Sequence, residues 1–275
     1  MRIAFLGTSA FACPALKALA EAHAIVLVIT QPDRPAGRKR ELRPSAVKNS
    51  ALDFGLRIAQ PERINSKEGI TLLREAAPEA IVVASYGQFL STKVFSLPPL
   101  GTINIHASLL PRYRGAAPIN WAIIRGETET GVTTFFIEKG MDSGKILVQR
   151  ACPIGPDETA GELHDRLAAL GAEAILETLR SIEEGTARPR AQQEEEATLA
   201  PKLSRADGKI DWTRSARDIH NLVRGLNPWP GAFTHLGAEA VKIHRTTITG
   251  IGHGAITIGT ITLQESGRLL VGTGD

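Results

Sequence analysis

Short runs of consecutive apolar residues recur through the first two thirds of the chain, and helical patterns separate them. The runs predict buried strands at 3–6, 24–30, 80–84, 103–105, 131–137 and 146–148. Proline is tolerated in a first helical turn, so Pro14 predicts a helix over 15–22. Continuous apolar strands that alternate with helices predict an α/β fold, with a Rossmann-like, mostly parallel sheet covered by helices on both faces.

Two capping-box spacings mark further helix starts. Asn65 is followed three residues later by Glu68, and Thr159 is followed by Glu162. After Thr159, leucine and isoleucine recur at roughly helical spacing as far as Gly185. We therefore expect a long helix that ends the α/β part of the chain.

The pattern changes after Gly185. Residues 186–208 are polar and mixed, which is typical of a linker. Beyond them come one helical stretch, at about 215–226, and short β-type segments punctuated by glycines, at 232–235, 240–248, 255–263 and 268–271. We expect three parts: an α/β domain at 1–185, a linker at 186–208 and a small β barrel or half-barrel at 209–275. A barrel of this kind needs about five strands, so we expect this one to be incomplete at its C-terminal end.

Composition and charge narrow the functional classes. The hydrophobic content of 43% and the charged content of 22% are those of a globular protein. The longest apolar runs fall far short of the ~18 residues that a membrane span needs, and the N-terminus lacks the pattern of a signal peptide. Two cysteines cannot form a disulfide scaffold, so we expect a cytoplasmic protein. The net charge of +3 means that a polyanion must bind a local patch.

Candidate catalytic groups gather after the fourth predicted strand. Asn104 and His106 lie two residues apart, so their side chains leave the same face of the strand. The turn at 108–111 then takes the chain off the carboxyl edge of the sheet, where α/β proteins bind ligands. An amide and an imidazole there could stabilise a reacting carbonyl. The alternative is that both side chains only satisfy hydrogen bonds of the turn.

A carboxylate in another loop could complete this site. Asp142 lies between Gly140 and Gly144, at the end of another predicted strand. A carboxylate facing His106 would hold the imidazole in its cationic form, as an oxyanion stabiliser needs. Spacing alone leaves open an ordinary turn aspartate.

The segment 104–118, taken with the Asp142 loop, resembles the formyltransferases that use 10-formyltetrahydrofolate. The resemblance implies that Asn104, His106 and Asp142 are the catalytic trio. It also implies a folate site formed by Ser108, Leu109, Leu110 and Pro111, by the stretch of Tyr86, Gly87, Gln88, Phe89 and Leu90, and by the loop of Ile137, Glu138, Lys139, Gly140 and Met141. The formyl donor would be a co-substrate, with no tightly bound cofactor and no metal.

Other segments indicate which branch of the family the chain resembles. Residues 7–12 hold one glycine, so neither a phosphate loop nor a dinucleotide site is expected there. Residues 31–38 resemble the loop insertion of the branch that formylates initiator methionyl-tRNA for translation initiation. Residues 227–231 and the β-rich tail resemble the tRNA-contacting C-terminal domain of that branch. The resemblance implies that 1–185 is the catalytic domain and that 209–275 is an OB-like barrel. The resemblance implies initiator methionyl-tRNA as the partner, and we expect a monomer.

A basic run supports RNA binding independently of the resemblance. Residues 34–48 hold one acidic residue among six basic ones. Arginine pairs well with phosphate oxygens, so we expect tRNA contacts from Arg34, Arg38, Lys39, Arg40 and Arg43. A solvated charged loop is an equally good interpretation of such a run by itself. The prolines and glycine within it suggest a loop that becomes ordered on binding.

Two other functions remain open. A related folate-dependent enzyme could formylate a sugar-nucleotide amine, keeping Asn104, His106 and Asp142 but remaining indifferent to tRNA. A non-enzymatic RNA-binding protein would use the basic run and the barrel and would show no turnover with any formyl donor.

Overall fold

The computed structural model describes residues 1–36, 41–249, 257–263 and 269–275. The chain divides into two compact units that are interleaved along the sequence. The larger unit contains Met1–Arg114, Gly131–Cys152 and His164–Leu199, and the smaller one contains Gly115–Thr130, Pro153–Leu163 and Ala200–Asp275. The domain boundaries expected at 185 and 208 stay sequence-based predictions.

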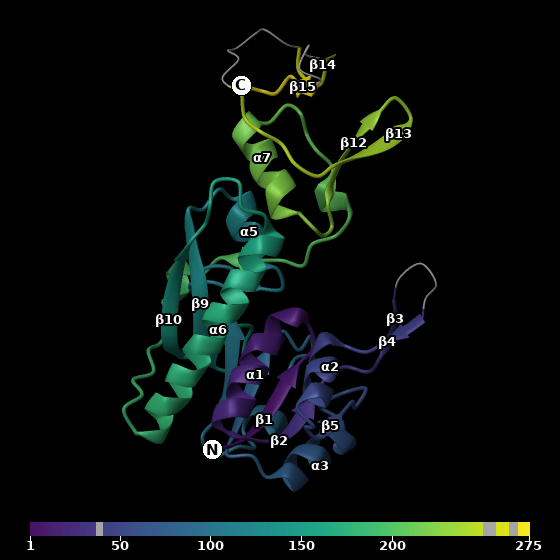
Figure 1. The fold of residues 1–275 in the computed structure, drawn as a ribbon. Helices are drawn as coiled ribbons and strands as arrows, with labels where there is room; N and C mark the ends of the chain where they lie inside the picture. The colour runs from purple at the N-terminus through teal and green to yellow at the C-terminus, as the bar shows by residue number, and fades with distance from the viewer. Residues whose placement is uncertain (37–40, 250–256, 264–268) are drawn as a thin grey trace. The chain divides into compact units, whose positions relative to one another are not determined.

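Seven of the described strands form one sheet, in the order β10-β9-β7-β6-β1-β2-β5 (Figure 1). Their bounds are β1 Arg2–Gly7, β2 Ala24–Ile29, β5 Ile58–Ala59, β6 Ala80–Ala84, β7 Thr102–His106, β9 Glu129–Phe136 and β10 Ile146–Pro153. The strands β1, β2, β5, β6 and β7 run parallel to one another, whereas β9 is antiparallel to β7. The mostly parallel sheet is as the apolar runs predicted.

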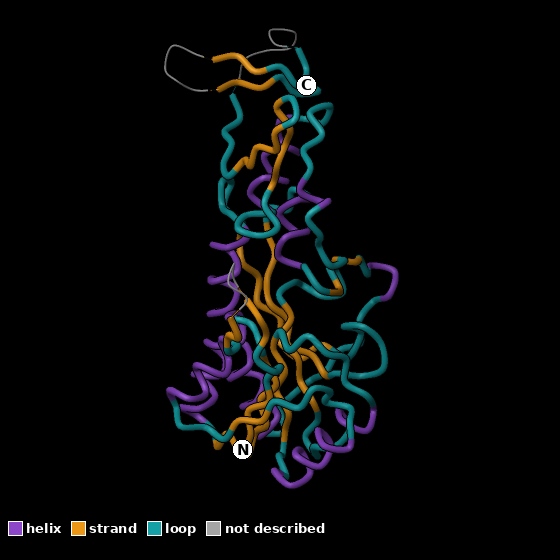
Figure 2. Tube along the Cα trace, turned by 90° about the vertical axis from the view of Figure 1, so that its right-hand side faces the viewer, coloured by secondary structure: helices purple, strands orange, loops and turns teal. Residues whose placement is uncertain are grey.

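Helices lie on both sides of the sheet strands (Figure 2). They are α1 Cys13–Ala22, α2 Ala46–Asp53, α3 Lys67–Ala76, α4 Thr92–Phe95 and α6 Ala160–Glu183. Since a helix covers each face, β6 is buried along its whole length and β1 is buried except at Arg2. This double cover explains why the strands read as continuous apolar runs.

Local capping decides where the predicted helices begin. The Thr159 capping box is confirmed, because the Thr159 N–H donates to Glu162 Oε2 at 2.8 Å and the Glu162 N–H donates to Thr159 Oγ1 at 3.3 Å. The expected cap at Asn65 is displaced by one residue. Ser66 caps α3 by accepting from the Gly69 N–H at 3.2 Å, while the Asn65 amide donates to the carbonyl of Phe89.

Several short elements were not expected from the sequence. The basic run contains a small antiparallel hairpin of β3, Arg34–Ala36, and β4, Glu41–Arg43. Two further strands have two residues each. β8, at Arg114–Gly115, lies within the segment 104–118, and β11, at Leu199–Ala200, lies within the expected linker. Short 3-10 helices occupy Ala10–Ala12, Glu194–Glu196 and Ala206–Gly208.

The smaller unit has its own apolar centre and antiparallel strands. Its helices are α5, Pro118–Ile124, and α7, Ala216–Gly225, and its buried centre contains Ile210, Ile219, Val223 and Ala232. Two hairpins follow, β12 Ala232–Leu236 with β13 Glu239–Ile243, and β14 Ile261–Leu263 with β15 Leu269–Val271. The strand expected over 240–248 thus ends at Ile243. Whether these strands belong to an OB-like barrel stays a prediction, since 250–256 and 264–268 lie outside the described residues.

Candidate active site

Asn104 and His106 project from the last part of β7, a strand in the interior of the sheet. Asn104 is paired with Val83 of β6 on one side and with Phe135 of β9 on the other. Because the two residues are separated by one position, their side chains leave the same face of the sheet. His106 is buried and Asn104 is half-buried. The strand therefore fixes both groups in one direction.

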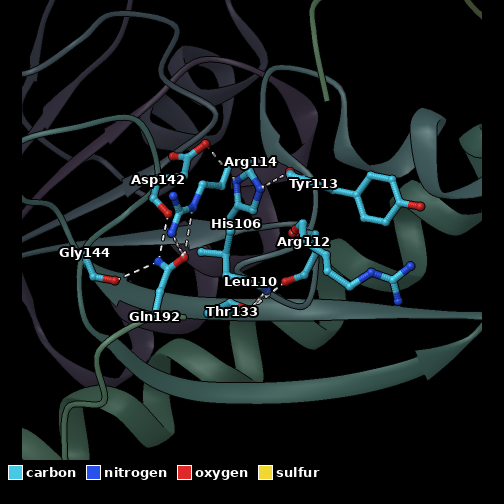
Figure 3. A network of polar contacts seen from close by, with 10 residues as sticks. His106, Leu110, Arg112, Tyr113, Arg114, Thr133, Asp142, Gly144 and Gln192 are labelled. Carbon is cyan, nitrogen blue, oxygen red and sulfur yellow. Dashed lines mark hydrogen bonds and ion pairs between the residues drawn. The ribbon is translucent and has the colours of Figure 1, made fainter. Parts of the chain in front are cut away.

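The His106 imidazole lies between two oxygen acceptors (Figure 3). Its Nε2 atom donates to the carbonyl oxygen of Tyr113 at 2.9 Å, since a carbonyl can only accept. Its Nδ1 atom lies 3.7 Å from Oδ2 of Asp142, within ion-pair range but beyond a normal hydrogen bond. A doubly protonated ring has a partner for each of its N–H groups in this arrangement. The structure thus joins two of the three expected catalytic residues.

The turn that carries Tyr113 is held by hydroxyl groups. Ser108 Oγ donates to the carbonyl of Arg112 at 2.6 Å. Thr133 Oγ1, on the neighbouring strand β9, donates to the carbonyl of Ser108 at 2.6 Å and accepts from the Leu110 N–H at 3.1 Å. Tyr113 itself has a left-handed backbone with φ of 62°, which costs free energy for a residue other than glycine. These bonds keep its carbonyl directed at His106.

Asp142 reaches His106 from a loop that begins at the far end of β7. Because β9 is antiparallel to β7, its last residue, Phe136, pairs with Ile103 near the start of β7. The loop after β9 must therefore reach back along β7 to bring the Asp142 carboxylate to His106. Asp142 has a left-handed backbone with φ of 50°, and Gly140 has φ of 119°. Gln192 Nε2 donates to the carbonyls of Asp142 and Gly144, at 2.8 Å each.

The expected folate residues after β6 lie beside an open pocket of about 620 Å³. Two of them, Gln88 and Phe89, line the pocket together with Arg63, Asn65 and Ser66. The Phe89 ring is 77% exposed. Gln88 is held in place, since its amide accepts from the Ile64 N–H and donates to the Glu62 carbonyl. The pocket lining does not include His106 or Asp142.

Other expected folate residues turn their side chains into the protein. Tyr86 is buried, and its carbonyl accepts from Thr8 Oγ1 and Gln31 Nε2, at 2.9 Å each. Ser108 and Leu110 are buried, and Leu110 packs with Phe135 and Ile146. Such residues can face a ligand only through their backbone. Other positions expected in the folate site are half-buried, Leu109, Pro111, Leu90 and Ile137, or exposed, Gly87, Glu138, Lys139, Gly140 and Met141.

The expected tRNA-binding residues are only partly described. Arg38, Lys39 and Arg40 lie outside the described residues. Arg34 and Arg43 face each other across the β3–β4 hairpin, and Arg34 forms an ion pair with Glu62 at 3.0 Å. Arg43 is exposed.

The remaining cation of the basic run is tied to the protein. Lys48 Nζ lies 2.6 Å from Oδ2 of Asp33. Hydrogen bonds from Lys48 and from the Gln60 amide lower the pKa of the Asp33 carboxyl. The basic run is therefore anchored at its C-terminal end by a charged pair.

Sequence reasoning missed three residues that build the site, Thr133, Arg114 and Gln192. Arg114 belongs to the singled-out stretch, but its partners are 78 and 80 residues away, at Gln192 and Glu194. Both partners lie in residues 186–208, which the sequence led us to expect as a linker. A composition-based interpretation cannot detect a contact that depends on the folded path of the chain.

Two negative observations concern the part of the chain that the structure describes. No group of three His, Cys, Asp or Glu side chains is placed to hold a metal ion there. No described helix combines the length and the apolar character that crossing a membrane requires.

Comparison with known proteins places these features in a family. The family model described as "Formyl transferase" matches residues 1–179, and the one described as "Formyl transferase, C-terminal domain" matches residues 202–275. A methionyl-tRNA formyltransferase of Pelobacter propionicus is 47% identical over 98% of this chain and 84% of its own length. That of Acetivibrio thermocellus is 45% identical over 100% of this chain and 88% of its own length.

A solved structure agrees with the fold. An N-formyltransferase of Helicobacter canadensis, in complex with folinic acid and dTDP-3-aminofucose, superposes with a TM-score of 0.73 over 99% of this chain and 96% of its own, at 19% identity. Such low identity supports the fold alone. The two family models, together with relatives close to half identical over nearly the whole chain, establish that this chain belongs to the formyl transferase family.

Proposed function

We propose that this chain transfers the formyl group of 10-formyltetrahydrofolate to the α-amino group of methionyl-initiator tRNA, giving N-formylmethionyl-tRNA for translation initiation. The observation that carries the chemistry is the His106 imidazole held between Tyr113 and Asp142, with Asn104 on the same face of β7. Acyl transfer requires stabilisation of a developing oxyanion, which an amide donor and the positive charge of an imidazolium provide.

Each group has a role in the proposed reaction. The methionyl amine attacks the formyl carbon. Asn104 donates to the formyl oxygen, and the positive charge of the His106 imidazolium stabilises that oxygen as it becomes negative. Asp142 stabilises the imidazolium and accepts the proton that the amine loses, directly or through water. When the bond between the formyl carbon and N10 breaks, N10 takes up a proton and tetrahydrofolate leaves. Proton movement and bond breaking therefore balance without a further reactant.

The half-buried Asn104 side chain supports its assignment as a ligand-facing donor. In the described part of the chain its amide has no hydrogen-bond partner within the protein, unlike the amides of Gln88 and Gln192. An amide on a sheet face with donors to spare can donate to the formyl oxygen of a bound substrate. The formyl donor, 10-formyltetrahydrofolate, would lie beside the loop that follows β6, where Gln88 and Phe89 line the open pocket.

The choice of acceptor rests on the relatives. The chain is 45–47% identical to two methionyl-tRNA formyltransferases, whereas its identity to the sugar-bound N-formyltransferase is 19%. The β3–β4 hairpin, with the basic run around it, would contact the acceptor stem of the tRNA. We infer that the protein works in the cytoplasm, where charged tRNA is used, and acts as a monomer.

The test is transfer of radiolabelled formyl from 10-formyltetrahydrofolate to three acceptors: methionyl-initiator tRNA, methionyl-elongator tRNA and a dTDP-linked amino sugar. We expect turnover with the initiator tRNA and at most a few per cent of that rate with the amino sugar. Preferential turnover with the amino sugar would overturn the acceptor, and no turnover with any of the three would overturn the activity.

A further inference from the structure

The linker segment contributes a side chain to the Asp142 loop. Gln192 is half-buried, and both the nitrogen and the oxygen of its side-chain amide form hydrogen bonds. Its Nε2 atom donates to the carbonyls of Asp142 and Gly144, and its Oε1 atom accepts from Arg114 Nε at 3.0 Å and from the second terminal nitrogen at 2.7 Å (Figure 3). The opposite orientation would set the amide N–H groups against the guanidinium, so the oxygen and nitrogen positions are fixed by their partners.

Arg114 is the fixed point that orients this amide. Its side chain is 7% exposed, and both oxygens of Glu194 accept from it at 2.8 Å, in a bidentate pair. Bidentate pairing between a guanidinium and a carboxylate restricts both groups geometrically. The hydrogen bonds from Arg114 also lower the pKa of the Glu194 carboxyl. The guanidinium therefore holds Gln192 from one side while the Asp142 loop binds the other.

The same linker segment also binds the turn that carries Tyr113. Thr198 Oγ1 accepts from the Tyr113 N–H at 2.8 Å, and the Thr198 carbonyl accepts from the Arg114 N–H at 2.8 Å. Residues 192–198 thus hold both residues whose oxygens flank His106. Thr198 binds the backbone N–H of Tyr113, and Gln192 binds the backbone carbonyls of Asp142 and Gly144.

We propose that Gln192 is a positioning residue for formyl transfer, which holds the backbone of Asp142 so that its carboxylate faces His106. The inference rests on the proposed function. The loop that carries Asp142 requires stabilising contacts, because it reaches back along β7 and has a left-handed backbone at Asp142. Its middle residues, from Glu138 to Met141, are exposed and contribute little packing.

Substitution by glutamate separates this role from a structural one. Gln192→Glu keeps the length of the side chain and an oxygen facing Arg114, but it removes both donations to the loop carbonyls. If Gln192 served only to pair the buried Arg114, glutamate would act as well as glutamine. If it positions Asp142, glutamate must fail. Gln192→Met removes both kinds of hydrogen bond and serves as a second variant should the glutamate prevent folding. Gln193 is exposed, and Gln193→Glu is the matched control.

We expect Gln192→Glu and Gln192→Met to lower kcat for formyl transfer about tenfold or more, because small misplacements of catalytic groups have effects of this size. The melting temperature of Gln192→Glu and its stoichiometry of folate binding should match those of Gln193→Glu. A kcat for Gln192→Glu within twofold of the unsubstituted protein would overturn the inference, as would an equal loss in Gln193→Glu.

A second measurement does not depend on activity. Hydrogen–deuterium exchange of the amides at 138–145 should speed up in Gln192→Glu and stay unchanged in Gln193→Glu. If the unsubstituted protein transfers no formyl group, the proposed function fails, while faster exchange still supports the hold on the loop. If transfer proceeds but neither exchange nor kcat responds to Gln192→Glu, only the inference fails.

Discussion

The Nε2 atom of His106 donates to the carbonyl oxygen of Tyr113 at 2.9 Å, which leaves Nδ1 as the ring nitrogen that faces Asp142. This bond fixes the plane of the ring relative to β7, because Tyr113 belongs to a turn that is itself held by Ser108 and Thr133. The orientation of the imidazole is therefore a property of the turn as much as of the strand.

Removing either member of the His106–Asp142 pair should abolish most of the activity. We expect His106→Ala and Asp142→Asn each to reduce kcat by at least ~100-fold, since a cation that stabilises the oxyanion and its charge partner contribute on this scale. Steady-state formyl transfer gives the rates, and circular dichroism checks that both variants fold. Exposed Asp165, replaced by Asn, is the control for the loss of a carboxylate. Rates near those of the unsubstituted protein in either variant would contradict the catalytic assignment.

The basic hairpin should govern the dependence of tRNA binding on salt. Arg43 is exposed on β4, and we expect Arg43→Ala to weaken tRNA binding and to reduce the slope of log K against log salt by up to ~0.9. Filter binding over a series of salt concentrations measures both quantities. The control is Arg74→Ala, an exposed arginine in α3, which should leave the slope unchanged. Identical slopes for both variants would mean that β4 does not contact the RNA.

Two buried threonines of β9 should respond oppositely to valine. Thr133 Oγ1 donates to the carbonyl of Ser108 and accepts from the N–H of Leu110. Thr133→Val therefore leaves this buried carbonyl and this buried N–H without their hydroxyl partner. We expect a loss of about 1–3 kcal/mol in the free energy of unfolding, measured by urea denaturation. Within the described residues, the buried Thr130 hydroxyl has no partner. Thr130→Val should therefore be neutral or stabilising, and a loss as large as that at Thr133 would refute the reasoning.

Tyr86 should make the protein sensitive to alkali. Burial raises the pKa of its phenol to about 12, so the folded chain keeps the proton at a pH where the unfolded chain releases it. A raised folded-state pKa contributes stability below the unfolded value of about 10, and this contribution is lost as pH rises towards 12. The urea midpoint of Tyr86→Phe should fall less than that of the unsubstituted protein between about pH 8 and about pH 11. If the urea midpoints of both proteins fell equally, Tyr86 would not be the group that makes the protein sensitive to alkali.

The strands were predictable where burial is complete. The strands β1 and β6 are continuous apolar runs because helices cover both faces, and a run of that kind leaves few other interpretations. The helix α2 was missed because only Val47 and Ala51 of its eight residues are buried, which leaves almost no periodic pattern. The cap of α3 was misplaced by one residue because asparagine and serine are both good caps, and the contact of Asn65 with Phe89 decides between them.

The site was predictable as a set of residue types and not as a geometry. Asn104 and His106 share a strand face by simple alternation, so their common direction follows from the sequence. The approach of Asp142 depends on the antiparallel insertion of β9, which periodicity does not reveal. The role of Gln192 depends on Arg114, at a separation of 78 residues, and no local pattern reports a contact at that range.

If Gln192 positions Asp142 as proposed, the long separation between these partners also determines how late in synthesis the Asp142 loop is held in place. The Gln192–Asp142 contact spans 50 residues and the Arg114–Glu194 contact spans 80. Contacts closed over such distances form late, because the intervening chain must first lose its freedom. A nascent polypeptide that has emerged from the ribosome only as far as α6 holds Asn104, His106 and Asp142 but lacks the residues that set the carboxylate in place. The hold on the Asp142 loop would thus arrive with the last stretch of the larger unit, after Asn104, His106 and Asp142 have been synthesised.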